Sequence, residues 1–364
     1  TAAVAAKLQT FEVESSEFDT RSFRGLRLPN GLRVLLCSDP AAKKAAAAMD
    51  VQVGWMSDPR QLPGLAHFCE HMLFLGTSGF PEEGDFERYV AAAAGSNNAY
   101  TDSEETCYYF DVSAGALPGA LERFSEFFSA PLFTESATAR EVSAINSEHA
   151  KNLQQDYWRY EQLLKLRANQ EHPYANFGTG NAATLSGGDA AARRALLDFH
   201  QAHYVAPQMS LAIVGPQSIP ELQRLATSQF GKLPATEVPP ASAAYDALPL
   251  PFPPGQGGSL TLMKPVAEQR SLTVAWCVPV TDFEAWASTK PDVVWRLLLS
   301  TRVDGGLVKA LRAEGLISGL DASVEELTRT FALLSVSFDL TALGLERWPE
   351  VVSALYAYLQ LLRD

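Results

Sequence analysis

Two histidines and a glutamate lie within five positions of the segment GLAHFCEHMLFLGT, residues 64–77. On a helix, His67 and His71 are four residues apart and lie one above the other on the same face. Two imidazoles at that spacing can bind one zinc ion, and Glu70 lies beside them without having to be a ligand. The order H-x-x-E-H is the inverted form of the zinc-protease motif. Because burying unpaired polar groups is costly, these side chains either have partners or face solvent.

A catalytic zinc site needs a third protein ligand and an open coordination position. The segment REVSAINSEHAKN, residues 140–152, lies in a long amphipathic helix that we predict over 134–166. Glu141 and Glu148 are seven residues apart on this helix and therefore share nearly one face. Either can supply a carboxylate ligand. Spacing alone leaves open the alternative that both are solvated surface carboxylates.

The flanking sequence predicts the elements that position the motif. Pro63 and Gly64 mark the start of a helix over 65–75, which Gly76 ends. A hairpin is predicted over 97–113, where a short strand, a polar turn and TCYYFDV follow one another. The remaining strands of this part are predicted over 32–37, 46–55 and 210–215, and its remaining helices over 82–94, 117–129, 189–204 and 218–230. For the FGTGN loop, residues 177–181, the residues themselves leave open simple turn chemistry as the explanation.

Proline content predicts a linker. Seven of the 22 prolines lie between Pro234 and Pro254, so we expect a catalytic domain over 1–233, a linker over 234–258 and a second domain over 259–364. The second part repeats the order of strands and helices without a second His/Glu cluster, and it looks incomplete. It includes strands near 259–264, 271–279 and 330–340, and helices near 291–300, 305–313 and from 346.

The bulk composition excludes several classes of protein. Of the 364 residues, 47% are hydrophobic and 20% are charged, as in ordinary globular proteins. A net charge of −13 argues against nucleic acid as a partner and favours neutral or basic ones. No apolar run approaches the roughly 18 residues of a membrane span. The four scattered cysteines fit free thiols, so we expect a cytoplasmic protein, or an organellar one if a targeting segment has been removed.

Several motifs, in order, resemble the M16 (insulinase/pitrilysin) family of zinc metallopeptidases. The resemblance covers nearly the whole chain from about Phe23. Within the family, the chain is most similar to the N-terminal half of the insulin-degrading subgroup. It implies an α+β fold of related domains, each a mixed, mostly antiparallel sheet flanked by helices. The matching motifs are HFCEHMLFLGT at 67–77, NNAYT at 97–101, TCYYFDV at 106–112, REVSAINSEHAKN at 140–152 and FGTGN at 177–181.

The resemblance assigns roles to the motif residues. It implies one zinc ion per chain with His67, His71 and Glu148 as ligands. It implies Glu70 as the general base, which takes a proton from water and delivers it to the leaving amine. Glu141 matches a family glutamate that supports the catalytic site.

The resemblance also implies how substrate is bound. Asn98, Ala99 and Tyr100 match an edge strand that pairs with the substrate backbone, which tolerates many peptide sequences. We therefore expect a zinc endopeptidase, or its N-terminal catalytic half, that hydrolyses unfolded peptides. A C-terminal M16 half, in the same chain or a separate one, would complete the chamber, so the 364-residue chain alone would be weakly active or inactive. The alternative is a non-catalytic structural or partner subunit of the same fold.

Overall fold

The computed structural model describes residues 7–185, 189–236, 238–239, 241–253, 255 and 257–364. The chain divides into two compact units. The first contains residues 1–151 and 176–244, and the second contains residues 152–175 and 245–364. The domain limits expected from the proline content stay a prediction.

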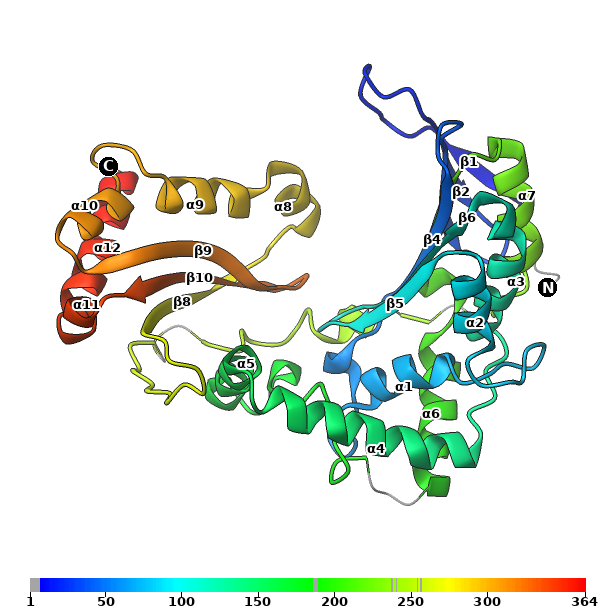
Figure 1. Cartoon of the computed structure of the whole chain (residues 1–364), viewed down its shortest axis with the longest axis horizontal. Helices are drawn as coiled ribbons and strands as arrows, with labels where there is room; N and C mark the ends of the chain where they lie inside the picture. The colour runs from blue at the N-terminus through cyan, green and yellow to red at the C-terminus, as the bar shows by residue number, and fades with distance from the viewer. Residues whose placement is uncertain (1–6, 186–188, 237, 240, 254, 256) are drawn as a thin grey trace. The chain divides into compact units, whose positions relative to one another are not determined.

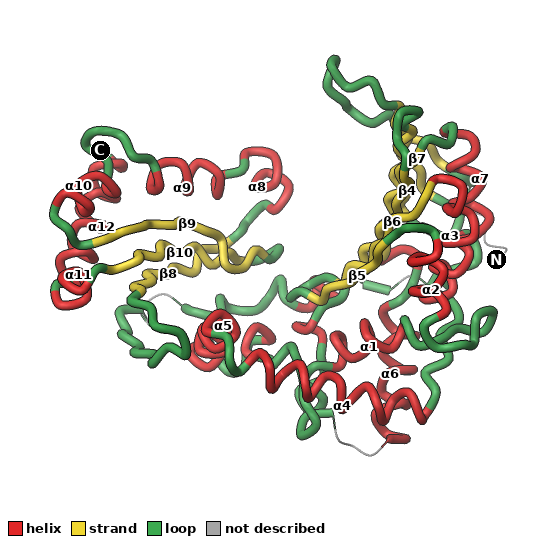
Figure 2. The backbone as a smooth tube through the Cα atoms, in the orientation of Figure 1, coloured by secondary structure: helices red, strands yellow, loops and turns green. Residues whose placement is uncertain are grey.

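The first unit is built on a seven-stranded sheet in the order β1-β2-β3-β7-β4-β6-β5 (Figure 2). Only the pair β3–β7 is parallel, and the other neighbours are antiparallel. This mixed, mostly antiparallel sheet confirms the fold class expected from the sequence. Its strands are β1 (Gln9–Phe11), β2 (Ser22–Arg27), β3 (Arg33–Ser38), β4 (Lys44–Val51), β5 (Ser96–Thr101), β6 (Thr106–Ser113) and β7 (Met209–Gly215).

Helices α2, α3 and α7 cover one face of this sheet (Figure 1). Helix α1 lies at one end, where it contacts α6 and the edge strand β5. The helices of the unit are α1 (Leu65–Leu73), α2 (Asp85–Ala92), α3 (Leu117–Phe127), α4 (Glu135–Asn152), α6 (Asp189–His203) and α7 (Ile219–Phe230). Short 3₁₀ turns are η1 (Trp55–Ser57), η2 (Ala114–Ala116), η4 (Ala206–Gln208) and η5 (Ala241–Ala244).

The strand sequences explain why one sheet face is covered. Along β6, alternate side chains are buried and the intervening ones are more exposed, which is the period-two pattern of a sheet packed on one side. Phe110 of β6 meets Phe124 of α3 edge to face, at 5.1 Å between ring centroids. Buried aromatic rings of this kind bring large apolar areas together and supply much of the core.

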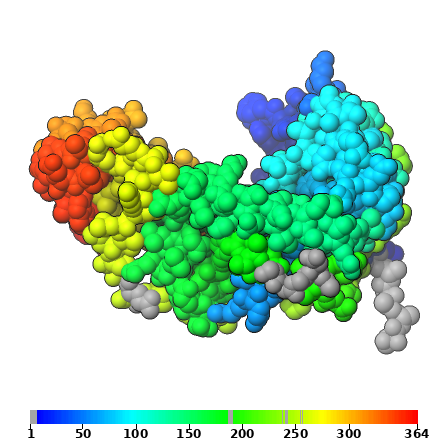
Figure 3. Space-filling view, turned by 60° about the horizontal axis from the view of Figure 1, so that its bottom comes forward, coloured from blue at the N-terminus to red at the C-terminus, as the bar shows by residue number. Residues whose placement is uncertain are grey.

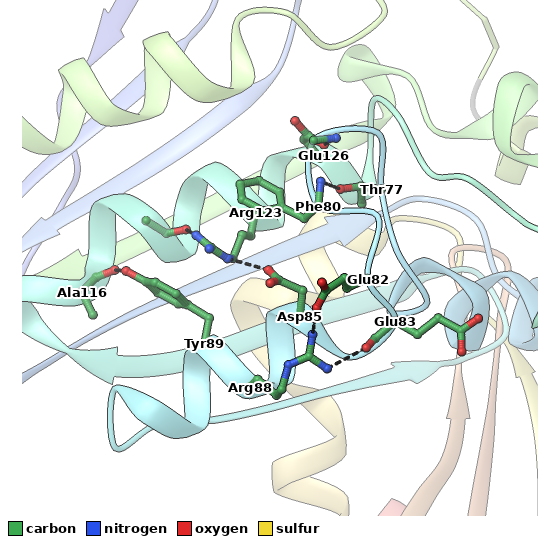
Figure 4. Close-up of polar contacts among 12 residues, drawn as sticks. Thr77, Phe80, Glu82, Glu83, Asp85, Arg88, Tyr89, Ala116, Arg123 and Glu126 are labelled. Carbon is green, nitrogen blue, oxygen red and sulfur yellow. Dashed lines mark hydrogen bonds and ion pairs between the residues drawn. The ribbon is translucent and has the colours of Figure 1, made fainter.

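Arg123 of α3 contacts both the loop between α1 and α2 and helix α2 itself (Figure 4). The guanidinium of Arg123 lies 4.2 Å from the ring centroids of both Phe80 and Tyr89. Its Nε donates to Asp85 at 2.7 Å. One turn later on α3, Glu126 accepts a hydrogen bond from the backbone of the same loop. These contacts hold the chain that follows α1 against the body of the unit.

The second unit contains a three-stranded antiparallel sheet in the order β8-β10-β9 (Figure 2). Leu299, Leu311, Phe338, Val351 and Leu355 belong to its buried core. Its strands are β8 (Ser271–Pro279), β9 (Ile317–Leu327) and β10 (Phe331–Leu340). Its helices are α5 (Asp156–Arg167), α8 (Phe283–Thr289), α9 (Pro291–Ser300), α10 (Leu307–Ala313), α11 (Ala342–Glu346) and α12 (Trp348–Arg363), with a 3₁₀ turn η3 (Pro173–Ala175).

The predicted long helix over 134–166 is wrong, because the chain leaves the helical conformation between α4 and α5. Gln155 is extended, and the carboxylate of Asp156 accepts hydrogen bonds from the backbone of Val266 and Ala267. The side chain of Arg159 donates to the carbonyl of Lys264. Side chains at the start of α5 thus bind the segment 264–267, and this long-range contact fixes where the new helix begins.

The predicted strand near 259–264 is also wrong, since those residues are irregular. Strand β9 was not predicted, because its sequence ISGLDASVEEL mixes acidic and apolar residues without clear alternation. Within the part of the chain that the structure describes, no helix has the length and apolar character needed to cross a membrane.

Candidate metal centre

Helix α1 carries the histidine motif, and its first turn is capped from a distance. The carboxylate of Asp58 accepts hydrogen bonds from the backbone N–H of Gly64, at 2.6 Å, and of Ala66, at 2.8 Å. Free N–H groups at a helix start need such acceptors, and a negative charge there is favourable. Gly64 has φ of 92°, a left-handed conformation that a residue with a side chain adopts only at a cost. The helix start is therefore held in place.

The structure brings together the three side chains that the sequence predicts as metal ligands. Their candidate ligand atoms all lie within 4.8 Å of one another. His67 Nε2 and His71 Nε2 are 3.1 Å apart. Glu148 Oε2, from helix α4, lies 3.7 Å from the first of these nitrogens and 3.6 Å from the second. Two imidazole nitrogens from successive turns of α1 and one carboxylate oxygen from α4 therefore lie close enough together to bind the same metal ion.

The other ring nitrogen of each histidine is also engaged. His71 Nδ1 lies 2.7 Å from Glu141 Oε1. Glu141 and Glu148 thus both reach the histidines from one face of α4. His67 Nδ1 lies 2.8 Å from the backbone carbonyl oxygen of Thr179. Acceptors at Nδ1 place the proton there and leave Nε2 with a lone pair, which is the arrangement of metal-binding histidines.

The electrostatics of the site follow from the charges of its side chains. Burial lowers the pKa of His71, but the hydrogen bond that its ring donates to Glu141 and the nearby Glu148 carboxylate outweigh this effect and raise the pKa to about 9. The same His71 ring lowers the pKa of the Glu148 carboxyl. Two acidic groups thus stabilise positive charge at this position, whether a proton or a metal ion carries it.

The FGTGN loop lies at the site, whereas turn chemistry was the alternative that its sequence left open. It delivers the Thr179 carbonyl to His67 because the residues on either side pack closely, Gly178 against Trp55 of η1 and Gly180 against Gly64 at the start of α1. A Cβ on Gly178 would lie 2.6 Å from the ring of Trp55, and a Cβ on Gly64 would lie 2.3 Å from the Cα of Gly180. The signal that indicates this role is the pair of glycines around one residue, which permits a close backbone approach.

Glu70 lies on the same helix, one residue before His71, and is only 8% exposed. Its Oε2 accepts a hydrogen bond of 2.6 Å from the hydroxyl of Thr101, the last residue of β5. The sequence analysis placed Glu70 beside the histidine pair but assigned nothing to Thr101. No local pattern signals this pair, because 31 positions separate the two residues.

Strand β5 is the last strand of the sheet and pairs only with β6 among the described strands. In the space-filling view, part of the cyan stretch of the first unit, the colour range to which β5 belongs, lies at the surface (Figure 3). Asn98, Ala99 and Tyr100 all lie on this edge strand. Asn98 and Tyr100 are exposed, whereas Ala99 is half-buried and packs against the core. The hydroxyl of Tyr100 donates to Glu105 across the hairpin turn, at 2.9 Å.

The donor set fits zinc. Zinc favours imidazole nitrogen and carboxylate oxygen at about 2.0–2.2 Å in a tetrahedron, which places neighbouring donor atoms about 3.3 Å apart. The three separations here are 3.1, 3.6 and 3.7 Å. Three protein ligands are also the number found in catalytic zinc sites, since the fourth position is left open. No other group of three His, Cys, Asp or Glu side chains converges in this way within the described ranges.

Two family models match the chain. Residues 33–171 match "Insulinase (Peptidase family M16)", and residues 191–364 match "Peptidase M16 inactive domain". The first match contains the whole cluster of His67, His71 and Glu148. The chain belongs to peptidase family M16. The second M16 match begins within the first unit, at α6, and extends to the last residue.

Known M16 proteins are similar over nearly the full length of the chain. Insulin-degrading enzyme of Drosophila melanogaster is 40% identical over 361 residues, which are 98% of this chain and 36% of that protein. The enzyme of Homo sapiens is 38% identical over 358 residues, 96% of this chain and 34% of that protein. The crystal structure of pitrilysin has a TM-score of 0.85 and 30% identity, and it covers 98% of this chain and 38% of that one. The chain thus spans about a third of the length of these relatives.

Proposed function

We propose that this chain carries the catalytic zinc site of an M16 endopeptidase. One observation carries the proposal: Nε2 of His67, Nε2 of His71 and Oε2 of Glu148 converge, with the carboxylate of Glu70 one residue away on the same helix. A structural subunit has no need for these ionisable groups on adjacent turns, where each must be paired at a cost. Membership of a peptidase family agrees with this chemistry.

In this proposal His67, His71 and Glu148 hold one zinc ion. When bound, zinc lowers the pKa of water and polarises the scissile carbonyl of a peptide. Glu70 takes the proton from the attacking water and delivers it to the leaving amine. Glu141 accepts from Nδ1 of His71, which fixes the orientation of that ring.

Strand β5 is the proposed substrate-binding element. An extended peptide pairs its backbone with the edge that carries Asn98, Ala99 and Tyr100, so that a carbonyl of the peptide lies near the metal. Binding through the backbone reads little of the side-chain sequence, and the net charge of −13 favours neutral or basic peptides. The relatives are about three times as long. We therefore propose that full activity needs a further M16 portion, in the same polypeptide or in a separate chain.

The test is cleavage of a quenched fluorogenic peptide by the zinc-loaded chain. Glu70→Gln preserves the shape and the zinc ligands but removes the base, so we expect turnover to fall by about 100-fold or more. A chelator should abolish turnover, and added zinc should restore it. Glu135→Gln is the matched control, because Glu135 is exposed in the first turn of α4.

Zinc binding separates the two interpretations if the isolated chain has no turnover. One equivalent of zinc bound by the wild type, and lost in a His67→Ala variant, supports a catalytic half that needs its complement. A chain that binds no zinc would contradict the proposed function and favour a structural subunit.

A further inference from the structure

Thr101 donates the hydrogen bond that holds Glu70. Its Oγ1 lies 2.6 Å from Glu70 Oε2, a short distance typical of a hydroxyl on a charged acceptor. Glu70 is 8% exposed, and Thr101 is half-buried. A glutamate side chain has three rotatable bonds, and fixing them costs conformational free energy. One hydroxyl on one carboxylate oxygen orients the group and leaves the second oxygen for another partner.

Thr101 is itself held in a rigid frame. The hairpin turn that follows it is bonded to the chain before α1, because Trp55 N donates to Asp102 O and Met56 N donates to Ser103 O, each at 3.0 Å. Gly54 permits this close approach, since a Cβ there would lie 2.0 Å from the Asp102 carbonyl oxygen. The position of the Thr101 hydroxyl is therefore set by backbone contacts rather than by a flexible side chain.

The same frame leads to the metal-binding helix. The 3₁₀ turn η1 directly precedes Asp58, and Asp58 caps the first turn of α1. Across the hairpin, the hydroxyl of Thr106 donates to the carbonyl of Val53 at 2.7 Å. Thr101 on β5 and Glu70 on α1 are thus positioned by one continuous set of hydrogen bonds, in which backbone groups bind one another or the side chains of Asp58 and Thr106. Such preorganisation is required when misplacement by about 1 Å costs about 100-fold in rate.

We propose that Thr101 is the positioning residue of the general base, and that it links the substrate-binding edge strand to the orientation of Glu70. This proposal rests on the proposed function, because it takes Glu70 as the base. Thr101 ends the strand that carries Asn98, Ala99 and Tyr100. A peptide paired along β5 therefore lies against the strand whose last residue, Thr101, orients the carboxylate of Glu70.

Two substitutions separate the hydroxyl from the shape of the residue. Thr101→Val keeps the β-branched shape that suits a strand and removes the donor, whereas Thr101→Ser keeps the donor. Thr273→Val is the matched control. Thr273 lies on β8 of the second unit, and its hydroxyl bonds to that of Ser337 at 2.9 Å. Each variant is compared with the wild type for melting temperature, which reports whether it folds, and for zinc dissociation constant. The dissociation constant should stay within twofold of the wild-type value in all three variants.

The deciding measurement is the position of the Glu70 carboxylate in crystal structures of the zinc-loaded wild type and variants. We expect the carboxylate in the wild-type position in Thr101→Ser and Thr273→Val, and displaced or in several conformers in Thr101→Val. Where the chain has turnover, kcat should fall about 10- to 100-fold in Thr101→Val with little change in KM, and Thr101→Ser should retain most of it.

An unmoved Glu70 carboxylate in Thr101→Val would overturn the proposal, and so would an unchanged kcat. These results are distinguishable from failure of the proposed function. If Glu70→Gln is as active as the wild type, Glu70 is not the base and the proposal falls with it. If the wild type has no turnover, the crystallographic comparison still decides whether Thr101 positions Glu70.

Discussion

The hydrogen bond between Glu141 and His71 makes a quantitative prediction for zinc affinity. The two atoms are 2.7 Å apart, and the side chains are only 18% and 25% exposed. Glu141→Gln keeps an acceptor oxygen of the same shape and removes the negative charge that stabilises the ring and its bound metal. Loss of such a partner typically weakens metal binding about 10- to 100-fold. This corresponds to about 1.4–2.7 kcal/mol of binding free energy.

The same loss appears in thermal stability, because zinc that binds only the folded state stabilises it by its binding free energy. One kcal/mol shifts Tm by about 2–4 °C in a domain of this size. The rise in Tm on adding saturating zinc should therefore be about 3–11 °C smaller in Glu141→Gln than in the wild type. The assay is a pair of melting curves for each protein, one with a chelator and one with zinc. This difference cancels any effect of the substitution on the metal-free fold.

Glu135→Gln provides the control, because Glu135 is exposed in the first turn of the same helix. Its zinc-dependent rise in Tm should equal that of the wild type. An equal rise in Glu141→Gln would refute the role given to Glu141. The absence of any rise in the wild type would refute the metal site itself.

Two further predictions concern the first unit. Gly178→Ala places a Cβ 2.6 Å from the Trp55 ring, so we expect a loss of about 1–3 kcal/mol in unfolding free energy and, through the shifted Thr179 carbonyl, weaker zinc binding. Denaturant titration and zinc competition measure the two effects, with Gly115→Ala as a control, since a Cβ at Gly115 would contact nothing within 4 Å. Burial lowers the pKa of His200 to about 4. Between pH 6.5 and pH 4 His200 binds a proton in the unfolded chain but not in the folded chain, so its contribution to stability falls by roughly 3 kcal/mol as the pH falls through this range. In His200→Gln this part of the pH dependence should be absent from urea unfolding curves, and an unchanged slope would contradict the assignment.

Local patterns were sufficient where one element carries the information. The spacing of His67, Glu70 and His71 predicted their arrangement because helical geometry depends only on positions in sequence. The seven-residue spacing of Glu141 and Glu148 likewise placed both on one face of α4. The strand, turn and strand signals over 97–113 predicted the hairpin that β5 and β6 form. The mostly antiparallel sheet was implied by the family resemblance. By contrast, the limits of the long helix were wrong, because contacts of Asp156 with residues more than 100 positions away end one helix and begin the next.

The sequence by itself determined the donor types and the helical face on which they lie, since these depend on residue identity and a period of 3.6. Spacing left open which of the two glutamates is the ligand, and the family resemblance implied Glu148. Only the tertiary structure decided which nitrogen each carboxylate meets: Glu148 lies at the two Nε2 atoms, and Glu141 lies at Nδ1 of His71. It also decided the roles of the Thr179 carbonyl and the Thr101 hydroxyl. These partners are 112 and 31 positions from the side chains they bind. Hydrogen bonds between distant segments depend on how the helices and strands pack, and no local period of the chain encodes that packing.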